Sequence, residues 1–137
     1  MEHKYTLNER YTELAHQVIH SVPELNYLAS AQVTIGYMES DYKKKSHGRV
    51  VFAECIKVKD IYKYFTPCDF LIVVYEPNVA LMDEVQLKIL LEHELLHIKI
   101  ENPDDIEPVY SINPHDVEDF RSILDKYGID WNAVDDI

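Results

Sequence analysis

Residues 69–100 read DFLIVVYEPNVALMDEVQLKILLEHELLHIKI, and this stretch decides the fold. The continuous apolar run over 69–75 predicts a strand that is buried on both faces. The stretch over 79–100 is long enough for a helix and is apolar on much of its circumference. A helix of this kind packs on more than one side, so we expect it in the centre of a domain.

The residues before this stretch predict one helix, two strands and a short turn. Apolar residues recur at helical spacing over 7–20, and Pro23 closes that segment. Alternating β-forming residues predict strands over 31–39 and 50–58, and the polar residues between them favour an antiparallel hairpin. A short helical turn is expected at 60–65. The expected apolar face of the first helix consists of Leu7, Tyr11, Leu14, Ala15 and Val18.

The residues after the central stretch predict a loop and a last helix. Residues 101–113 contain two prolines, which is typical of a loop, and residues 114–127 have helical spacing up to a stop at Gly128. The resulting order predicts an α+β fold, in which a small three-stranded sheet packs on a central helix flanked by N- and C-terminal helices. Because the sequence has no repeat and no flexible linker, we expect one domain over 1–137.

Composition and charge exclude several classes of protein. The chain has 137 residues, 47% of them hydrophobic and 28% charged, which is typical of a globular domain. Its net charge of −12 argues against a nucleic-acid partner, and most of the net negative charge lies in residues 101–137. No signal peptide or membrane-spanning segment is recognisable, and Cys55 and Cys68 indicate no disulfide framework. We therefore expect a cytoplasmic protein without a membrane partner.

One basic run interrupts the acidic sequence. It consists of Lys43, Lys44, Lys45 and Arg49, with His47 among them. We interpret it as a solvated loop between the two predicted strands. The alternative is a small contact site for an anionic substrate or partner.

Residues 93–97 read His-Glu-Leu-Leu-His. Positions i and i+4 share one face of a helix, so His93 and His97 can bind the same metal ion. Neutral imidazole suits Zn²⁺, which lowers the pKa of a bound water to roughly 7. Glu94 would then accept the proton of that water as the general base. The alternative is that all three side chains are hydrogen-bonded polar residues of the core.

A catalytic zinc ion usually has three protein ligands and one open position, so a third ligand is needed. His115 is the first candidate, because Pro114 restricts the backbone before it and Asp116 or Asp119 could hold its imidazole. Glu118 is the alternative third ligand and would give a site of two histidines and one glutamate.

Other polar candidates are weaker. His16 and His20 also stand four residues apart, but no glutamate lies in the corresponding place between them. We interpret them as a surface or helix-end pair. Tyr110 precedes the candidate third ligands in the sequence and is a possible donor to a developing oxyanion.

Two stretches of the sequence, HELLHI at 93–98 and HDVEDF at 115–120, resemble the putative phage metallopeptidase family, a group of small zincin-like domains of phages and prophages. The stretch LDKYGIDW at 124–131 is similar to the C-terminal end of that family. HDVEDF is the more discriminating part, because many zincins share HExxH. The residues after 97, IKIENPDD, lack the glycine and histidine of the metzincin pattern and exclude that subclass.

The resemblance implies a zinc-dependent hydrolase with a zincin-like fold. It places His93, His97 and His115 on the metal and makes Glu94 the base. If the chain is phage-encoded, the expected compartment is the cytoplasm of the host cell.

Two classes of function are compatible with these residues. The first is a zinc metallopeptidase acting on a protein or peptide, including a regulatory protease that cleaves a single host or phage protein. The second is a zinc-binding interaction module with little or no activity, which would contact a host or phage protein through its acidic C-terminal region. Glu94 favours catalysis, because a structural zinc site needs no base. No feature of the sequence selects an oligomeric state or a cleavage specificity.

Overall fold

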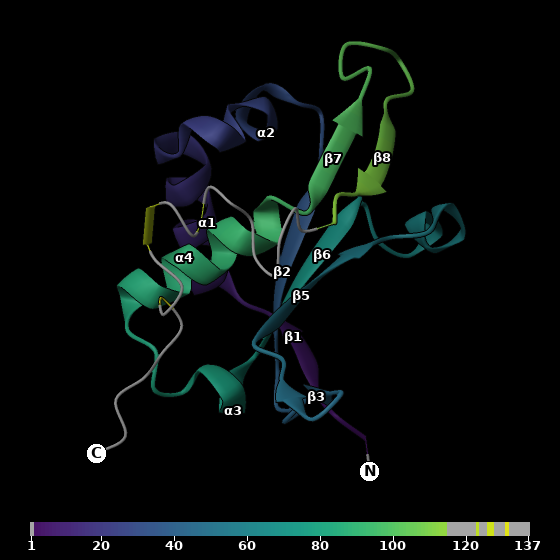
Figure 1. The fold of residues 1–137 in the computed structure, drawn as a ribbon. Helices are drawn as coiled ribbons and strands as arrows, with labels where there is room; N and C mark the ends of the chain where they lie inside the picture. Colours follow the sequence, from purple (N-terminus) through teal and green to yellow (C-terminus); the bar gives the residue numbers. More distant parts are fainter. Residues whose placement is uncertain (1, 115–122, 124–125, 128–130, 132–137) are drawn as a thin grey trace.

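The computed structural model describes residues 2–114, 123, 126–127 and 131, and Figure 1 shows its mixed α+β fold. Within these residues a four-stranded sheet has the order β1-β2-β6-β5. Strands β2 and β6 are parallel, whereas β1 and β5 pair antiparallel at the two edges. The strands are β1 (Tyr5–Leu7), β2 (Ile35–Ser40), β5 (Ala53–Lys57) and β6 (Phe70–Tyr75). The prediction of three strands is wrong, because Tyr5–Leu7 adds a fourth through its pairing with β2.

Four α-helices and two 3₁₀ helices occur among the described residues. In Figure 1, α1, α2 and α4 gather on one side of the sheet, with α4 beside α1. This arrangement confirms the α+β class. The helices are α1 (Glu9–Ser21), η1 (Pro23–Leu25), α2 (Asn26–Ser30), η2 (Asp60–Tyr64), α3 (Glu76–Val79) and α4 (Glu84–Leu95).

The predicted strand over 69–75 is confirmed as β6, and it lies between β2 and β5. Five of its six residues are buried, because a strand that is apolar on both faces is covered on both. Close packing at β2 also requires a glycine: a Cβ on Gly36 would lie 2.8 Å from Leu71 Cδ2 and 2.9 Å from Cys68 Sγ. The predicted hairpin between 31–39 and 50–58 is wrong, because β6 inserts between the two strands and pairs with both.

The segment between β2 and β5 forms a small hairpin of its own. It pairs β3 (Lys45–Ser46) with β4 (Arg49–Val50) in antiparallel register. The turn residues His47 and Gly48 have φ angles of 52° and 75°, as a tight two-residue hairpin turn requires. The hairpin is exposed, which agrees with the interpretation of Lys45, His47 and Arg49 as part of a solvated loop. Lys44 departs from that interpretation, because it is half-buried and forms an ion pair with Glu54.

The predicted long helix over 79–100 is shorter and begins later. Asp83 caps α4 by accepting a hydrogen bond from the Gln86 amide, while the Gln86 side chain accepts one from the Asp83 amide. The helix ends at Leu95, and the chain continues as β7 (Ile98–Glu101), which pairs with β8 (Val109–Ile112). The loop predicted over 101–113 is therefore largely the turn and second strand of a hairpin, which projects beyond the sheet in Figure 1.

The first helix begins two residues later than predicted. Asn8 is its N-cap and accepts a hydrogen bond from the Tyr11 amide at 2.9 Å. Leu7 is therefore not part of the apolar helix face; it belongs to β1 and is 72% exposed. The remaining members of the predicted face are buried in the core: Tyr11, Leu14, Ala15 and Val18.

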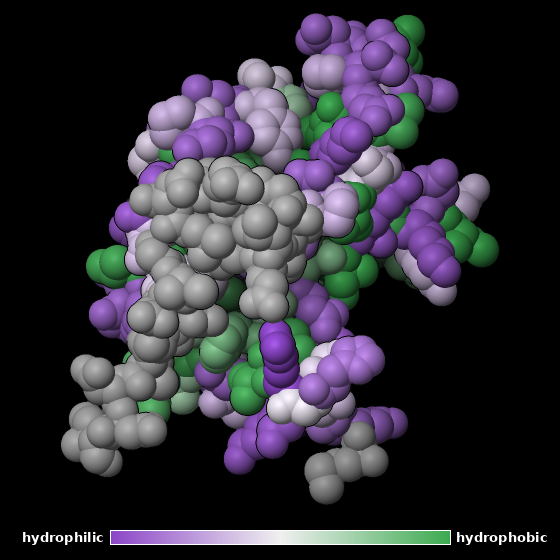
Figure 2. All heavy atoms as spheres, viewed as in Figure 1, coloured by the Kyte–Doolittle hydropathy of each residue, from purple (hydrophilic) through white to green (hydrophobic). Residues whose placement is uncertain are grey.

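The core lies between the sheet and the helices, and the buried residues of α4 contribute to it on several sides. Among the coloured atoms of Figure 2, hydrophilic residues predominate, and hydrophobic side chains appear at several places between them, including the right edge of the view. No helix within the described ranges is long and apolar enough to cross a membrane. The helix predicted over 114–127 falls mostly outside the residues that the structure describes.

Candidate metal centre

His93, Glu94 and His97 come together at the C-terminal end of α4. Each offers one ligand atom, and these atoms all lie within 4.8 Å of one another. The two imidazole rings have centroids 5.3 Å apart. The geometry therefore agrees with the prediction that His93 and His97 lie close enough to bind the same metal ion.

The local backbone differs from the prediction of one continuous helix. His97 lies beyond the end of α4, after Leu96, which keeps right-handed helical angles. The His97 amide donates to the Glu94 carbonyl at 3.1 Å, a tightened final turn of the 3₁₀ type. This turn keeps His97 one turn away from His93, although regular helix has ended.

The cluster is largely shielded from solvent. Glu94 is 4% exposed, and both histidines are half-buried. Glu94 Oε2 lies 3.9 Å from His93 Nε2. Two half-buried imidazoles and a buried carboxylate match the ligand preference of Zn²⁺, so the residues present fit a zinc ion.

The carbonyl groups that follow the helix end have partners in other elements. The hydroxyl of Tyr27, in α2, donates to the Ile98 carbonyl at 2.5 Å and lies 3.5 Å from that of Leu95. Asn113, directly after β8, donates through Nδ2 to the Leu96 carbonyl at 3.3 Å and through its amide to the His97 carbonyl at 2.5 Å. These bonds satisfy the acceptors that a helix leaves open at its C-terminus and hold the backbone around His97.

Asn113 also orients the imidazole of His97. Nδ1 of His97 lies 2.7 Å from the Asn113 carbonyl oxygen. Because a carbonyl only accepts hydrogen bonds, Nδ1 carries the proton and donates it. The lone pair of the neutral ring is then on Nε2, which is the arrangement expected of a histidine that binds a metal through Nε2.

Trp131 lies beside the other histidine. Its ring centroid is 6.1 Å from that of His93, and its carbonyl accepts a hydrogen bond from Gln86 Nε2 at 3.4 Å. Trp131 is 9% exposed and belongs to the core cluster. A residue near the end of the chain therefore covers the flank of the metal motif.

Cys55, in β5, lies near the carboxylate of the cluster. Burial raises the pKa of its thiol, and the negative charge of Glu94 raises it further. The thiol is therefore protonated at neutral pH. Cys55 therefore resembles a small apolar residue, and it packs against the core.

The other predicted site residues are either outside the described residues or elsewhere in the fold. His115 and Glu118, the two candidate third ligands, lie outside the described residues, as do Asp116 and Asp119. His16 and His20 are exposed on α1 with ring centroids 4.5 Å apart, as expected of a surface pair.

Tyr110 has a different partner from the one predicted. Its hydroxyl donates to the Gln32 carbonyl at 2.7 Å, and its ring packs edge-on against Phe70. Tyr110 therefore joins β8 to the segment before β2. The structure does not support its assignment as an oxyanion donor.

Sequence reasoning missed Tyr27, Asn113 and Trp131. The roles of Tyr27 and Asn113 depend on contacts between segments far apart in the chain, and a single sequence carries no signal for such contacts. Trp131 did fall within the C-terminal resemblance, but only the structure places it against His93.

Comparison with known proteins supports the resemblance to a metallopeptidase family. The family model described as "Putative phage metallopeptidase" matches residues 3–136, a longer stretch than the two motifs and the C-terminal similarity recognised in the sequence. No curated protein and no solved structure gives a significant match. The match covers nearly the whole chain and includes the residues that the structure gathers at the end of α4. This chain therefore belongs to the family described as putative phage metallopeptidase.

Proposed function

We propose that this protein is a zinc-dependent metallopeptidase built as a single zincin-like domain over residues 1–137. The observation that carries the proposal is the convergence of ligand atoms from His93, Glu94 and His97 within 4.8 Å of one another. The family description supports a metallopeptidase, and the hydrolysis of a peptide bond implies a protein or peptide substrate. A cytoplasmic setting, in the host if the chain is phage-encoded, is part of the same proposal.

In this proposal His93 and His97 hold Zn²⁺, and Glu94 is the general base. When bound, the ion would supply Lewis acidity and lower the pKa of a coordinated water. Glu94 lies 3.9 Å from His93 Nε2, close enough to take a proton from a water held at the cluster. The Asn113 carbonyl fixes the protonation of His97 at Nδ1 and leaves Nε2 to face the ion.

The third ligand in this proposal is His115, with Glu118 as the alternative. The support is the position of Asn113, which is bonded to the carbonyls of Leu96 and His97. His115 follows Asn113 by two residues, and two residues span at most roughly 7 Å of chain. This short spacing supports His115 as the third ligand.

The experiment that tests the proposal measures metal and activity on the same samples. Elemental mass spectrometry after dialysis gives the zinc content of the wild type and of Glu94→Gln, His115→Ala and Glu118→Ala. A tryptic peptide library from a bacterial lysate, analysed for new termini, reports cleavage without a known substrate. The double variant His16→Gln/His20→Gln is the matched control, because it removes an i, i+4 histidine pair elsewhere.

We expect one zinc per chain in the wild type, in Glu94→Gln and in the control, and loss of zinc in His115→Ala. Glu94→Gln should retain the metal but produce no new termini, because an amide cannot accept the proton. A zinc-loaded wild type that produces no new termini would favour the zinc-binding interaction module instead. A wild type that cannot be loaded with zinc would contradict both functions.

A further inference from the structure

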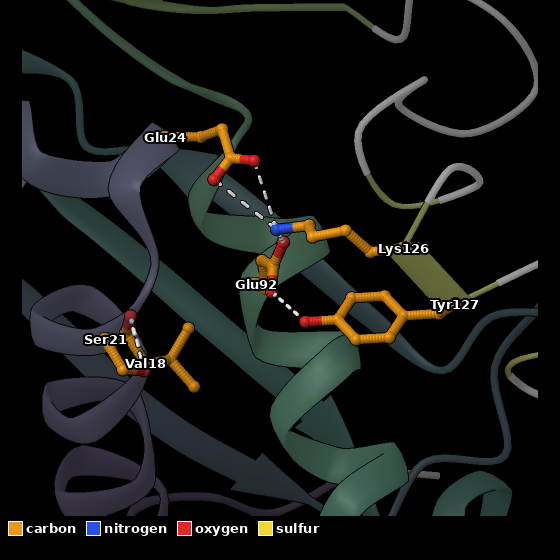
Figure 3. Close-up of polar contacts among 6 residues, drawn as sticks. All are labelled: Val18, Ser21, Glu24, Glu92, Lys126 and Tyr127. Carbon is orange, nitrogen blue, oxygen red and sulfur yellow. Dashed lines mark hydrogen bonds and ion pairs between the residues drawn. The ribbon is translucent and has the colours of Figure 1, made fainter.

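Glu92 is a buried carboxylate on α4, directly before His93 in the sequence. It is 1% exposed, although it carries a charge that is costly to bury without partners. Its two described partners both come from the C-terminal part of the chain (Figure 3). The Lys126 ammonium forms an ion pair with Glu92 Oε2, and the Tyr127 hydroxyl donates to Glu92 Oε1 at 2.7 Å.

Lys126 also reaches a second carboxylate. Its ammonium lies 3.3 Å from Glu24 Oε1, in η1, and 5.5 Å from the centroid of the Tyr127 ring. Burial raises the pKa of Tyr127, and the hydrogen bond to Glu92 raises it further, so this hydroxyl is a donor at neutral pH. We call Glu24, Glu92, Lys126 and Tyr127 the Glu92 clamp.

The Glu92 clamp is one of several attachments of the C-terminal segment to α4 and its end among the described residues. Asn113 is bonded to the backbone of Leu96 and His97, and the Trp131 carbonyl accepts a hydrogen bond from Gln86. The chain thus leaves the helix end beside His97 and is attached to the same helix again at Glu92. Residues 114–125 connect Asn113 to the Glu92 clamp, and they include both candidate third ligands.

We propose that Glu92, Lys126 and Tyr127 are positioning residues that hold the C-terminal segment on α4 and thereby pre-organise the metal site. The expected effect on zinc binding rests on the proposed function. A segment fixed at both ends has less conformational freedom to lose when one of its residues binds an ion. Glu92 and its partners therefore affect zinc affinity indirectly, by holding the segment that carries the third ligand.

The test uses full-length variants that remove single groups. Lys126→Met removes the ammonium and keeps the apolar stem, Tyr127→Phe removes one hydroxyl, and Lys126→Arg restores the cation. Lys99→Met is the charge-matched control, since Lys99 forms an exposed ion pair with Glu101. Val58→Ala is the stability control, since Val58 is buried but lies outside the core cluster that contains α4.

Zinc affinity is measured by competition with a chelating dye. We expect Lys126→Met to raise the zinc Kd about tenfold or more, as the loss of a group that orients a ligand does. Tyr127→Phe should raise it less, and Lys126→Arg should restore most of the wild-type affinity. Lys99→Met and Val58→Ala should leave the Kd unchanged. An unchanged Kd in Lys126→Met, or an equal rise in Val58→Ala, would overturn the inference.

Hydrogen exchange of the metal-free proteins separates this inference from the proposed function. We expect faster amide exchange over residues 114–131 in Lys126→Met than in the wild type, with β6 equally protected in both. A wild type that binds no zinc would refute the proposed function, and exchange would still decide whether the Glu92 clamp holds the segment. Equal exchange over 114–131 in the two proteins would overturn the clamp.

Discussion

The Nδ1 atom of His97 lies 2.7 Å from the carbonyl oxygen of Asn113, and the side chain of Asn113 bonds to the Leu96 carbonyl. One residue after β8 thus orients a histidine of the metal motif and satisfies the backbone beside it. The end of the β7–β8 hairpin is therefore part of the support of the candidate metal centre.

The Asn113 side chain can be tested directly. Asn113→Ala removes the bond to the Leu96 carbonyl, and we expect a loss of about 1 kcal/mol in the free energy of unfolding and a weaker zinc affinity. Urea titration and dye competition measure the two effects. Asn78→Ala is the matched control, because the Asn78 side chain also donates through Nδ2 to backbone carbonyls, those of Lys44 and Val51, away from the metal motif. It should lower stability and leave zinc affinity unchanged; an equal effect of both variants on zinc would contradict the role of Asn113.

Trp131 provides a spectroscopic probe of the site. It is the one tryptophan of the chain, and its ring centroid lies 6.1 Å from that of His93. Co²⁺ bound at the motif should therefore quench tryptophan fluorescence, and excess Zn²⁺ should reverse the quenching by displacing Co²⁺. The quenching should disappear in His93→Gln and persist in His16→Gln/His20→Gln. Quenching that depends on His16 and His20 instead would place the ion elsewhere.

Replacing Gly36 with a larger residue is predicted to destabilise the fold. In Gly36→Ala the new Cβ would lie 2.8 Å from Leu71 Cδ2 and 2.9 Å from Cys68 Sγ, so neighbouring atoms must move. We expect the free energy of unfolding to fall by about 1–3 kcal/mol, as in other overpacked cores. The double variant Gly36→Ala/Leu71→Ala should lose less than the sum of the two single variants. Strict additivity in urea titrations would show that the clash with Leu71 does not cause the loss.

Stability should fall in alkaline solution because of buried tyrosines. Burial is the main cause that raises the pKa of Tyr37 above its usual value near 10, and the side chain is 6% exposed. Above pH 10 the unfolded chain loses this proton while the folded chain keeps it, so the free energy of unfolding decreases as pH rises. Urea titrations between pH 8 and pH 11 should show a shallower decrease in Tyr37→Phe than in the wild type. Parallel curves would contradict this cause.

Local patterns were reliable where one segment determines its own environment. The apolar run over 69–75 has no polar face to expose, so it had to become the covered strand β6. The helical spacing of Tyr11, Leu14 and Val18 gave the buried face of α1 for the same reason. The motif around His93 depends only on spacing within one chain segment, and its side chains do converge.

Patterns failed where a distant segment decides the outcome. The predicted helix extended to residue 100, yet Ile98–Glu101 form β7, because Val109–Ile112 offers a strand to pair with. The strands over 31–39 and 50–58 were expected to pair, but β6 fits between them and bonds to both. Leu7 was expected at the start of the first helix, and it belongs instead to β1, which completes the sheet edge.

The sequence by itself determined the α+β class, the buried strand and the identity of the residues at the metal motif, because these follow from spacing and hydrophobicity within short segments. The tertiary structure alone decided how the motif is supported. Tyr27, Asn113, Lys126 and Trp131 reach α4 from other parts of the chain. Such contacts form only when burial of the whole core brings those segments together, and no local pattern encodes them.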